Sequence, residues 1–139
     1  MQNGKIIAYG AEDFNKVKPF TKKISEIKSF VWNIIQENKP LIVGLEDTQL
    51  QSNVEVFQKL TKLLGVLENQ LFENNIEFYT VEPSAWRKTC NIKGKKREEQ
   101  KENAIKFVKE NFGLDVDSDC ADAICLTWHI YQVTLKDIT

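Results

Sequence analysis

The sequence predicts an α/β or mixed α+β fold, in which helices pack against a sheet. Short apolar segments alternate along the chain with longer segments whose apolar residues recur every three or four positions. No repeat, low-complexity tract or linker interrupts this alternation. A length of 139 residues is typical of one domain with a real core, so we expect residues 1–139 to form a single domain.

Three short apolar segments are typical of strands. Residues 4–10 are bounded by glycines, and Asn3 and Gly4 form the dipeptide that is favoured in two-residue hairpin turns. Residues 41–45 are a continuous apolar run, which predicts a strand buried on both faces. Residues 76–81 have the pattern of a further strand, so we expect three strands in the sheet.

Apolar residues at helical spacing predict long helices at residues 18–38, 54–72, 98–111 and about 119–133. Pro83 can open a short additional helix, because proline is favoured at the first helical position. We expect Gly113 to end the helix at 98–111, and Ser118 to cap the N-terminus of the last helix.

Composition narrows the classes of function. The net charge of −1 and the pI near 5.9 mean that any nucleic-acid binding must come from a local basic patch. The apolar stretches are too short to span a membrane and the N-terminus is polar, so we expect no signal peptide, no membrane association and a cytoplasmic protein. Cys90, Cys120 and Cys125 fit no metal-ligand spacing and are expected to be reduced thiols. His129 is the only histidine, which argues against His-ligated zinc and against a triad hydrolase.

Three carboxylates form the candidate catalytic group. Glu46 directly follows the apolar run at 41–45, at the carboxyl edge of the expected sheet, where open α/β sheets bind ligands. Asp119 and Asp122 are three residues apart, so on a helix their side chains leave the same face. Taken singly, such residues are usually solvated or favour the helix dipole. Together they predict a Mg²⁺ site for phosphodiester chemistry, because gathered carboxylates repel unless a divalent cation neutralises them.

A basic stretch precedes the helix at 98–111. Its members and their close neighbours are Arg87, Lys88, Lys93, Lys95, Lys96 and Arg97. A flexible basic loop suits contacts with DNA phosphates, which give affinity without reading bases. The alternative is a solvated loop, in which Glu98 and Glu99 dilute the positive charge. Trp86 could stack on a base, although a tryptophan beside an arginine more often packs within its own domain.

These residues resemble those of the RuvC-like Holliday-junction resolvases, members of the RNase H-like superfamily. The matching pieces are residues 42–49 (IVGLEDTQ), 64–67 (LGVL), 81–88 (VEPSAWRK), the basic loop and 119–124 (DCADAI). Their order and spacing match over roughly residues 41–131, about two-thirds of the chain. The strand that ends in Glu-Asp, combined with the late Asp-x-x-Asp-Ala, is the most specific part of the match.

The resemblance implies an RNase H-like mixed sheet flanked by helices, and a homodimer that acts on branched double-stranded DNA. It implies an endodeoxyribonuclease of phage or mobile-element type that cuts four-way junctions in recombination or repair with Mg²⁺, or with Mn²⁺. Glu46, Asp119 and Asp122 then carry over as metal ligands. Lys101 stands where the family keeps a lysine near the active site, for phosphate binding or transition-state charge stabilisation, although it could equally be a solvated helix lysine.

One family element is expected to be absent. Family members begin with a strand that carries a catalytic aspartate, followed by a second strand and a tight turn into a third. Asn3 and Gly4 match the turn and residues 5–9 match the third strand, so the chain resembles a family member that lacks its first strands and first catalytic aspartate. It could be a fragment, a shortened relative that binds without cutting, or a fold whose strands pair anew. Glu12 or Asp13 could supply a substitute carboxylate.

Two other functions remain open on the same fold. The first is a non-catalytic DNA-binding or assembly module that has lost the first catalytic aspartate. The second is another nuclease activity, such as cleavage of RNA–DNA hybrids, because a fold does not determine a substrate.

Overall fold

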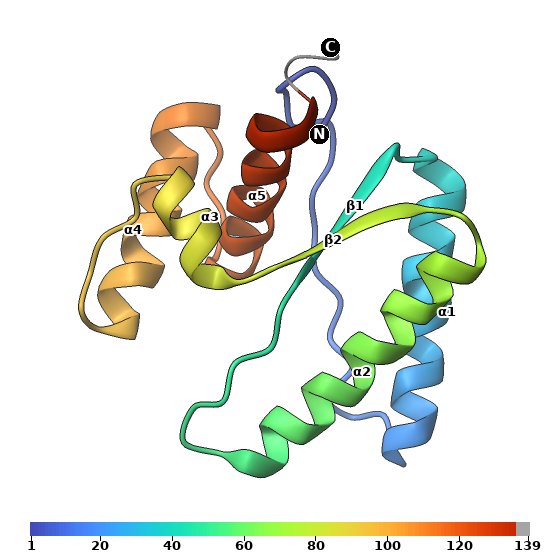
Figure 1. Ribbon diagram of the computed structural model, residues 1–139. Coiled ribbons are helices and arrows are strands. Elements are labelled where there is room, and N and C mark those ends of the chain that lie inside the picture. Colours follow the sequence, from blue (N-terminus) through green and yellow to red (C-terminus); the bar gives the residue numbers. More distant parts are fainter. Residues whose placement is uncertain (136–139) are drawn as a thin grey trace. The chain divides into compact units, whose positions relative to one another are not determined.

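The computed structural model describes residues 1–135 (Figure 1). Its elements, in chain order, are α1 (Phe20–Asn38), β1 (Ile42–Glu46), α2 (Val54–Glu73), β2 (Glu77–Val81), α3 (Pro83–Thr89), α4 (Arg97–Phe112), α5 (Ser118–Ile130) and the π-helical turn η1 (Tyr131–Leu135). Packing divides the chain into two compact units. The sheet unit is Glu12–Thr80, and the helical unit is Met1–Ala11 together with the chain from Val81.

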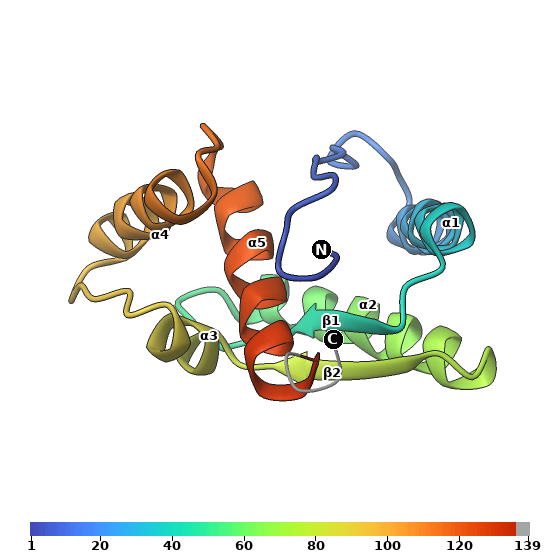
Figure 2. The same ribbon diagram turned by 90° about the horizontal axis from the view of Figure 1, so that it is seen from above.

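The sheet unit is a β-α-β arrangement with one further helix. β1 and β2 pair as parallel strands, with α2 as the crossover between them (Figures 1 and 2). The Thr80 hydroxyl on β2 donates a hydrogen bond to the Glu68 carboxylate on α2 over 2.7 Å. α1 packs against α2, where the Gln70 side-chain amide donates to the Lys28 carbonyl over 3.4 Å. The parallel pair is the local structure that positions Glu46, the last residue of β1.

The start and the buried face of α2 both follow from its local sequence. Asn53 caps its N-terminus, because the Asn53 side chain accepts a hydrogen bond from the Val56 N–H over 3.1 Å. Leu67 and Leu71 lie on its buried face, and Leu71 has no exposed surface. The predicted helix at 54–72 is thus confirmed, and so are the helix at 18–38 and the strand at 76–81.

The helical unit is built around α5, which packs against both α3 and α4. Its core includes Trp86 from α3, Val108 from α4 and Cys125 from α5, all at most 1% exposed. Pro83 opens α3 as predicted. Gly113 ends α4 in the left-handed conformation, with φ of 69°, also as predicted.

The N-terminal segment corrects one prediction and confirms another. Asn3 and Gly4 have φ values of 52° and 76°, those of a type I′ turn, and Gln2 and Lys5 exchange backbone hydrogen bonds of 2.9 and 3.0 Å across it. The hairpin turn is therefore confirmed. The strand predicted at residues 4–10 is wrong, because residues 6–10 find no neighbouring strand among the described residues and a strand needs a partner for its ladder.

Two further details differ from the sequence-based expectations. Ile42–Glu46 is a strand as expected, but its apolar side chains are only half-buried. The expectation of a strand buried on both faces is therefore wrong. The described sheet has only the two strands β1 and β2, so each strand has a neighbour on one side alone. The N-cap of the last helix is Asp117 rather than Ser118, since the Asp117 carboxylate accepts the Cys120 N–H over 2.9 Å.

Among residues 1–135, no helix combines the length and the apolar character that a membrane crossing demands.

Replacement of Leu71 by alanine tests the packing of the sheet unit. The Leu71 side chain is fully buried, so Leu71→Ala is expected to lower the free energy of unfolding by about 2–5 kcal/mol in chemical denaturation. The neighbouring Phe72 is 74% exposed and is the matched control, with an expected change within about 0.5 kcal/mol for Phe72→Ala. Equal losses in the two variants would contradict this packing.

Candidate active site

The start of α5 places two of the candidate carboxylates. The hydrogen bond from the Cys120 N–H to the Asp117 carboxylate holds the first turn and lowers the pKa of Asp117. The regular helix then puts Asp119 and Asp122 on one face, one turn apart. Asp119 is exposed, whereas Asp122 is half-buried beside the fully buried Ala121. The predicted pairing of these two aspartates on one helix face is confirmed.

The surroundings of Asp122 mix burial with opposing charges. Burial raises the pKa of the Asp122 carboxyl, and the negative charge of Asp119 raises it further. The positive charges of Arg87, Lys101 and Arg97 act in the opposite direction. The structure therefore brings side chains from α3 and α4 to the acidic face of α5. A carboxylate pair with cations in electrostatic range is suited to a negatively charged ligand such as a phosphodiester together with a divalent cation.

Packing between α3 and α5 supports the position of Arg87. The Thr89 hydroxyl and His129 Nδ1 lie 2.6 Å apart, in a hydrogen bond that joins the two helices. The Arg87 guanidinium lies 5.1 Å from the centre of the Trp86 ring, in a cation–π contact. The Arg87 Nε is buried and has no hydrogen-bond partner among the described residues. Trp86 is 1% exposed, so it belongs to the core and does not offer its ring to a base.

Glu46 lies at the exposed end of β1, as its place after an apolar run predicts. It belongs to the sheet unit, whereas Asp119 and Asp122 belong to the helical unit. That Glu46 shares one metal site with the two aspartates therefore stays a prediction. Within the described part of the helical unit, no third carboxylate, cysteine or histidine completes a metal-binding group beside the pair. The donor chemistry suits Mg²⁺, which takes a few carboxylates and fills its other positions with water or phosphate oxygens.

The basic stretch is an exposed loop that leads into α4. Lys88, Lys93, Lys95, Lys96 and Arg97 are exposed, and Arg87 is half-buried. Gly94 is required in this loop, since its φ is 145° and a Cβ there would lie 2.9 Å from the Glu99 Cβ. The Gln100 side chain donates to the Gly94 carbonyl over 3.1 Å, which ties the loop to the first turn of α4. The predicted exposed loop at the basic stretch is thus present, while its contact with DNA stays a prediction.

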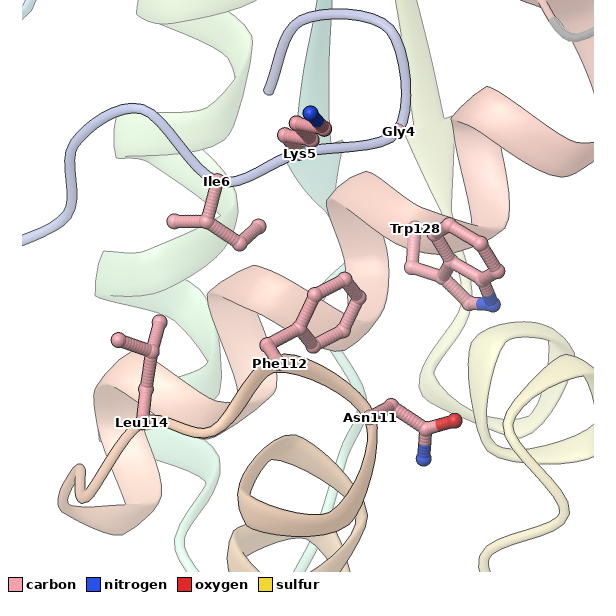
Figure 3. A pocket seen from close by; sticks show the side chains of 7 residues that line it. All are labelled: Gly4, Lys5, Ile6, Asn111, Phe112, Leu114 and Trp128. Atoms are coloured by element: carbon pink, nitrogen blue, oxygen red, sulfur yellow. The ribbon is translucent and has the colours of Figure 1, made fainter.

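Sequence reasoning missed a cavity of about 360 Å³ in the helical unit. Its lining residues are Gly4, Lys5, Ile6, Asn111, Phe112, Leu114 and Trp128. Figure 3 shows the N-terminal segment at Lys5 and Ile6 next to the rings of Phe112 and Trp128, whose centres are 5.5 Å apart. None of the lining residues is a carboxylate, so the cavity offers no group for metal-assisted hydrolysis. No local sequence signal could have found it, because it joins segments more than 100 residues apart.

Known proteins that are similar to this chain in sequence include RuvC endodeoxyribonucleases. No protein-family model matches the chain. The crossover junction endodeoxyribonuclease RuvC of Rickettsia conorii is 24% identical over 124 residues, which cover 89% of this chain and 79% of that protein. The RuvC of Rickettsia akari is 25% identical over 132 residues, covering 95% and 84% of the two chains.

Two solved structures have a similar fold. The T. thermophilus RuvC structure in complex with a Holliday junction substrate matches with a TM-score of 0.74 at 17% identity, covering 95% of this chain and 81% of that one. A second Thermus thermophilus RuvC structure matches with a TM-score of 0.72 at 19% identity, covering 92% and 78% of the two chains.

The structural matches place the protein in the class of mixed α/β proteins with a RuvC-like fold. The sequence matches make the chain, more particularly, a distant homologue of the RuvC Holliday junction resolvases.

The burial of Asp122 generates a prediction about pH. A carboxyl whose pKa is raised in the folded state binds more protons folded than unfolded between the two pKa values. It therefore costs stability as the pH rises from the ordinary aspartate value of 3.8 through the folded pKa. Without divalent cations, Asp122→Asn is expected to be more stable than the wild type at pH 7. The difference should shrink towards pH 3, when both are measured by urea denaturation.

Asp115→Asn is the control for this prediction, because Asp115 is an exposed aspartate that pairs with Lys109 over 3.1 Å. It should not reproduce the gain in stability at pH 7. A loss of stability in Asp122→Asn at pH 7 would show that the attraction of Arg87, Lys101 and Arg97 outweighs the burial of the carboxylate.

Proposed function

We propose that the protein is a Mg²⁺-dependent, structure-specific endodeoxyribonuclease that acts on four-way DNA junctions in recombination or repair. The observation that carries the proposal is the carboxylate pair Asp119 and Asp122 on α5, with the cations Arg87, Lys101 and Arg97 in electrostatic range of Asp122. This pair lies in a chain that matches RuvC endodeoxyribonucleases over 89% of its length. Phosphodiester cleavage needs both a divalent cation and positive charge near the phosphoryl oxygens, and the α5 face has groups for each.

Each candidate residue has a separate role in the proposal. Glu46, Asp119 and Asp122 hold Mg²⁺ or Mn²⁺, which when bound supplies positive charge that polarises the phosphodiester. Lys101 and Arg87 stabilise negative charge on the phosphoryl oxygens. The guanidinium of Arg87 is preorganised for this role by its contact with Trp86, which limits its side-chain freedom.

The exposed basic loop supplies the contact with the DNA backbone. Lys88, Lys93, Lys95, Lys96 and Arg97 carry positive charge without a rigid base-reading geometry, which suits recognition of a junction by its shape. A four-way junction has symmetry-related strands, and paired cuts on it require two copies of the site. We therefore include a homodimer in the proposal, with the two copies related by a two-fold axis.

Cleavage of a labelled synthetic four-way junction tests the proposal. With Mg²⁺, the wild type should cut the junction and leave a linear duplex of the same sequence intact. Glu46→Gln, Asp119→Asn and Asp122→Asn should each lower the cleavage rate by about 100-fold or more, because each removes a metal ligand. The matched controls are Glu77→Gln at the start of β2 and Asp115→Asn, which should cleave as the wild type does.

The same reactions distinguish the alternatives. A wild type that binds the junction in a gel-shift assay but never cuts it, with Mg²⁺ or with Mn²⁺, would reject the enzyme and favour a DNA-binding module. Cleavage of an RNA–DNA hybrid in preference to the junction would reject the substrate. Full activity in Glu46→Gln would show that Glu46 is not a metal ligand.

The salt dependence of junction binding tests the basic loop. Neutralising two phosphate contacts by Lys95→Ala and Lys96→Ala together should weaken binding and reduce the slope of log K against log salt by about 2. The measurement is a fluorescence-anisotropy titration in Ca²⁺, which is chosen to avoid cutting. A pair of exposed lysines on α1, Lys22→Ala with Lys28→Ala, is the charge-matched control. Equal changes in the two double variants would mean that the loop acts only through net charge.

A further inference from the structure

Two cysteines from separate helices meet in the core of the helical unit. Cys90 caps the C-terminus of α3 and Cys125 lies in the middle of α5. The Cys90 thiol donates a hydrogen bond to the Cys125 carbonyl over 3.7 Å, so its sulfur lies beside the backbone of Cys125. A disulfide needs Cβ atoms about 3.5–4.5 Å apart, and a thiol in contact with the backbone of the other cysteine is near that arrangement.

The two thiols differ in their readiness to react. Interaction with the Cys125 side chain lowers the pKa of the Cys90 thiol, whereas interaction with the Cys90 side chain and burial raise the pKa of Cys125. Cys90 also lines a cavity of about 410 Å³, together with Lys93 and with Lys106 and Glu110, which pair over 3.8 Å. The thiolate is the nucleophilic form of a cysteine, so the lowered pKa favours reaction at Cys90. Cys90 lines this cavity and the fully buried Cys125 does not, so a small oxidant that enters it would meet Cys90 first.

The third cysteine has no such partner arrangement. Cys120 lies in the first turn of α5, where burial and the carboxylates of Asp117 and Asp119 raise the pKa of its thiol. It is five residues before Cys125, a separation that does not place two side chains on the same face of a helix. Cys120 is thus an internal control for any reaction of the pair.

We propose that Cys90 and Cys125 form a reversible redox pair, in which Cys90 reacts with a small peroxide and Cys125 resolves the product to a disulfide. The inference does not depend on the proposed nuclease activity, because it concerns thiol chemistry alone.

The reaction balances with hydrogen peroxide as the oxidant. The Cys90 thiolate attacks one peroxide oxygen, so an S–O bond forms and the O–O bond breaks. The departing hydroxide takes up the proton that the Cys90 thiol has lost and becomes water. The Cys125 sulfur then attacks the Cys90 sulfur, so the S–S bond forms, the S–O bond breaks and the departing hydroxide takes up the Cys125 proton as a second water. The two sulfurs lose two electrons in total and the peroxide gains them. A dithiol reductant returns both thiols by exchange.

The disulfide would join the helix that carries Arg87 to the helix that carries Asp122. Both helices are already packed together through the Thr89–His129 hydrogen bond, so the bond can form within the native arrangement. A cross-link at this point restricts relative movement of the cation and the carboxylate. Within a reducing compartment such pairs are transient and respond to oxidants rather than acting as permanent cross-links.

Thiol counting on the intact folded protein tests the proposal. The full chain is treated with hydrogen peroxide, quenched in acid, unfolded and titrated for free thiols. The count should fall from three to one per chain, and a dithiol reductant should restore it. Peptide mapping of the alkylated wild type should find residues 90 and 125 in one cross-linked pair, which requires no variant. Cys120→Ser should lose both of its remaining thiols in the same way.

Variants separate the two steps. In Cys125→Ser the sulfenic acid on Cys90 has no resolving thiol, so dimedone should label Cys90 in that variant and not in the wild type. In Cys90→Ser, the Cys125 thiol should stay reduced. The proposal is overturned if the folded wild type keeps three thiols, if Cys120 is found in the bond, or if the bond forms only after denaturant is added.

Discussion

The helical unit depends on the packing of α5 between α3 and α4. The buried face of α5 includes Ala121, Ile124 and Cys125, and it closes on Trp86 from α3 and Val108 from α4. Hydrophobic burial of this face holds the helix in one rotational setting, because a rotated helix would expose these side chains. Asp119 and Asp122 extend from the same helix, so their direction follows from the core contacts. Asp119 and Asp122 are thus positioned by the core packing of α5.

Charge around Asp122 is the second constraint. A half-buried carboxylate is costly unless charges of opposite sign compensate for its desolvation. Arg87, Lys101 and Arg97 supply that compensation from α3 and α4, and Asp119 works against it. Burial still raises the pKa of Asp122 despite these three cations, so desolvation is the dominant cost at this carboxylate. The arrangement is typical of functional sites, where stability is given up for a preorganised charge distribution.

The elements were largely predictable, because their signals are local. Pro83 opens α3, Gly113 ends α4, and the Asn3 and Gly4 turn forms as the dipeptide predicts, since each depends on the φ preference of one or two residues. The strand expected at residues 4–10 failed for the opposite reason. A strand exists only through hydrogen bonds to a neighbour, and apolar composition does not show whether that neighbour is present. The N-cap moved from Ser118 to Asp117 because both residues can cap a helix and only the backbone geometry chooses between them.

The sequence by itself determined the candidate donors and their spacing: Glu46 at the end of a strand, and Asp119 and Asp122 on one helix face. These follow from the side-chain periodicity of helices and strands, which a short stretch of sequence is enough to show. Only the tertiary structure decided what surrounds them. It brought Arg87 and Lys101 to the aspartates, buried Trp86 away from any base, and set Cys90 against Cys125. Contacts of this kind join residues far apart in sequence and depend on how three helices pack, which local pattern cannot specify.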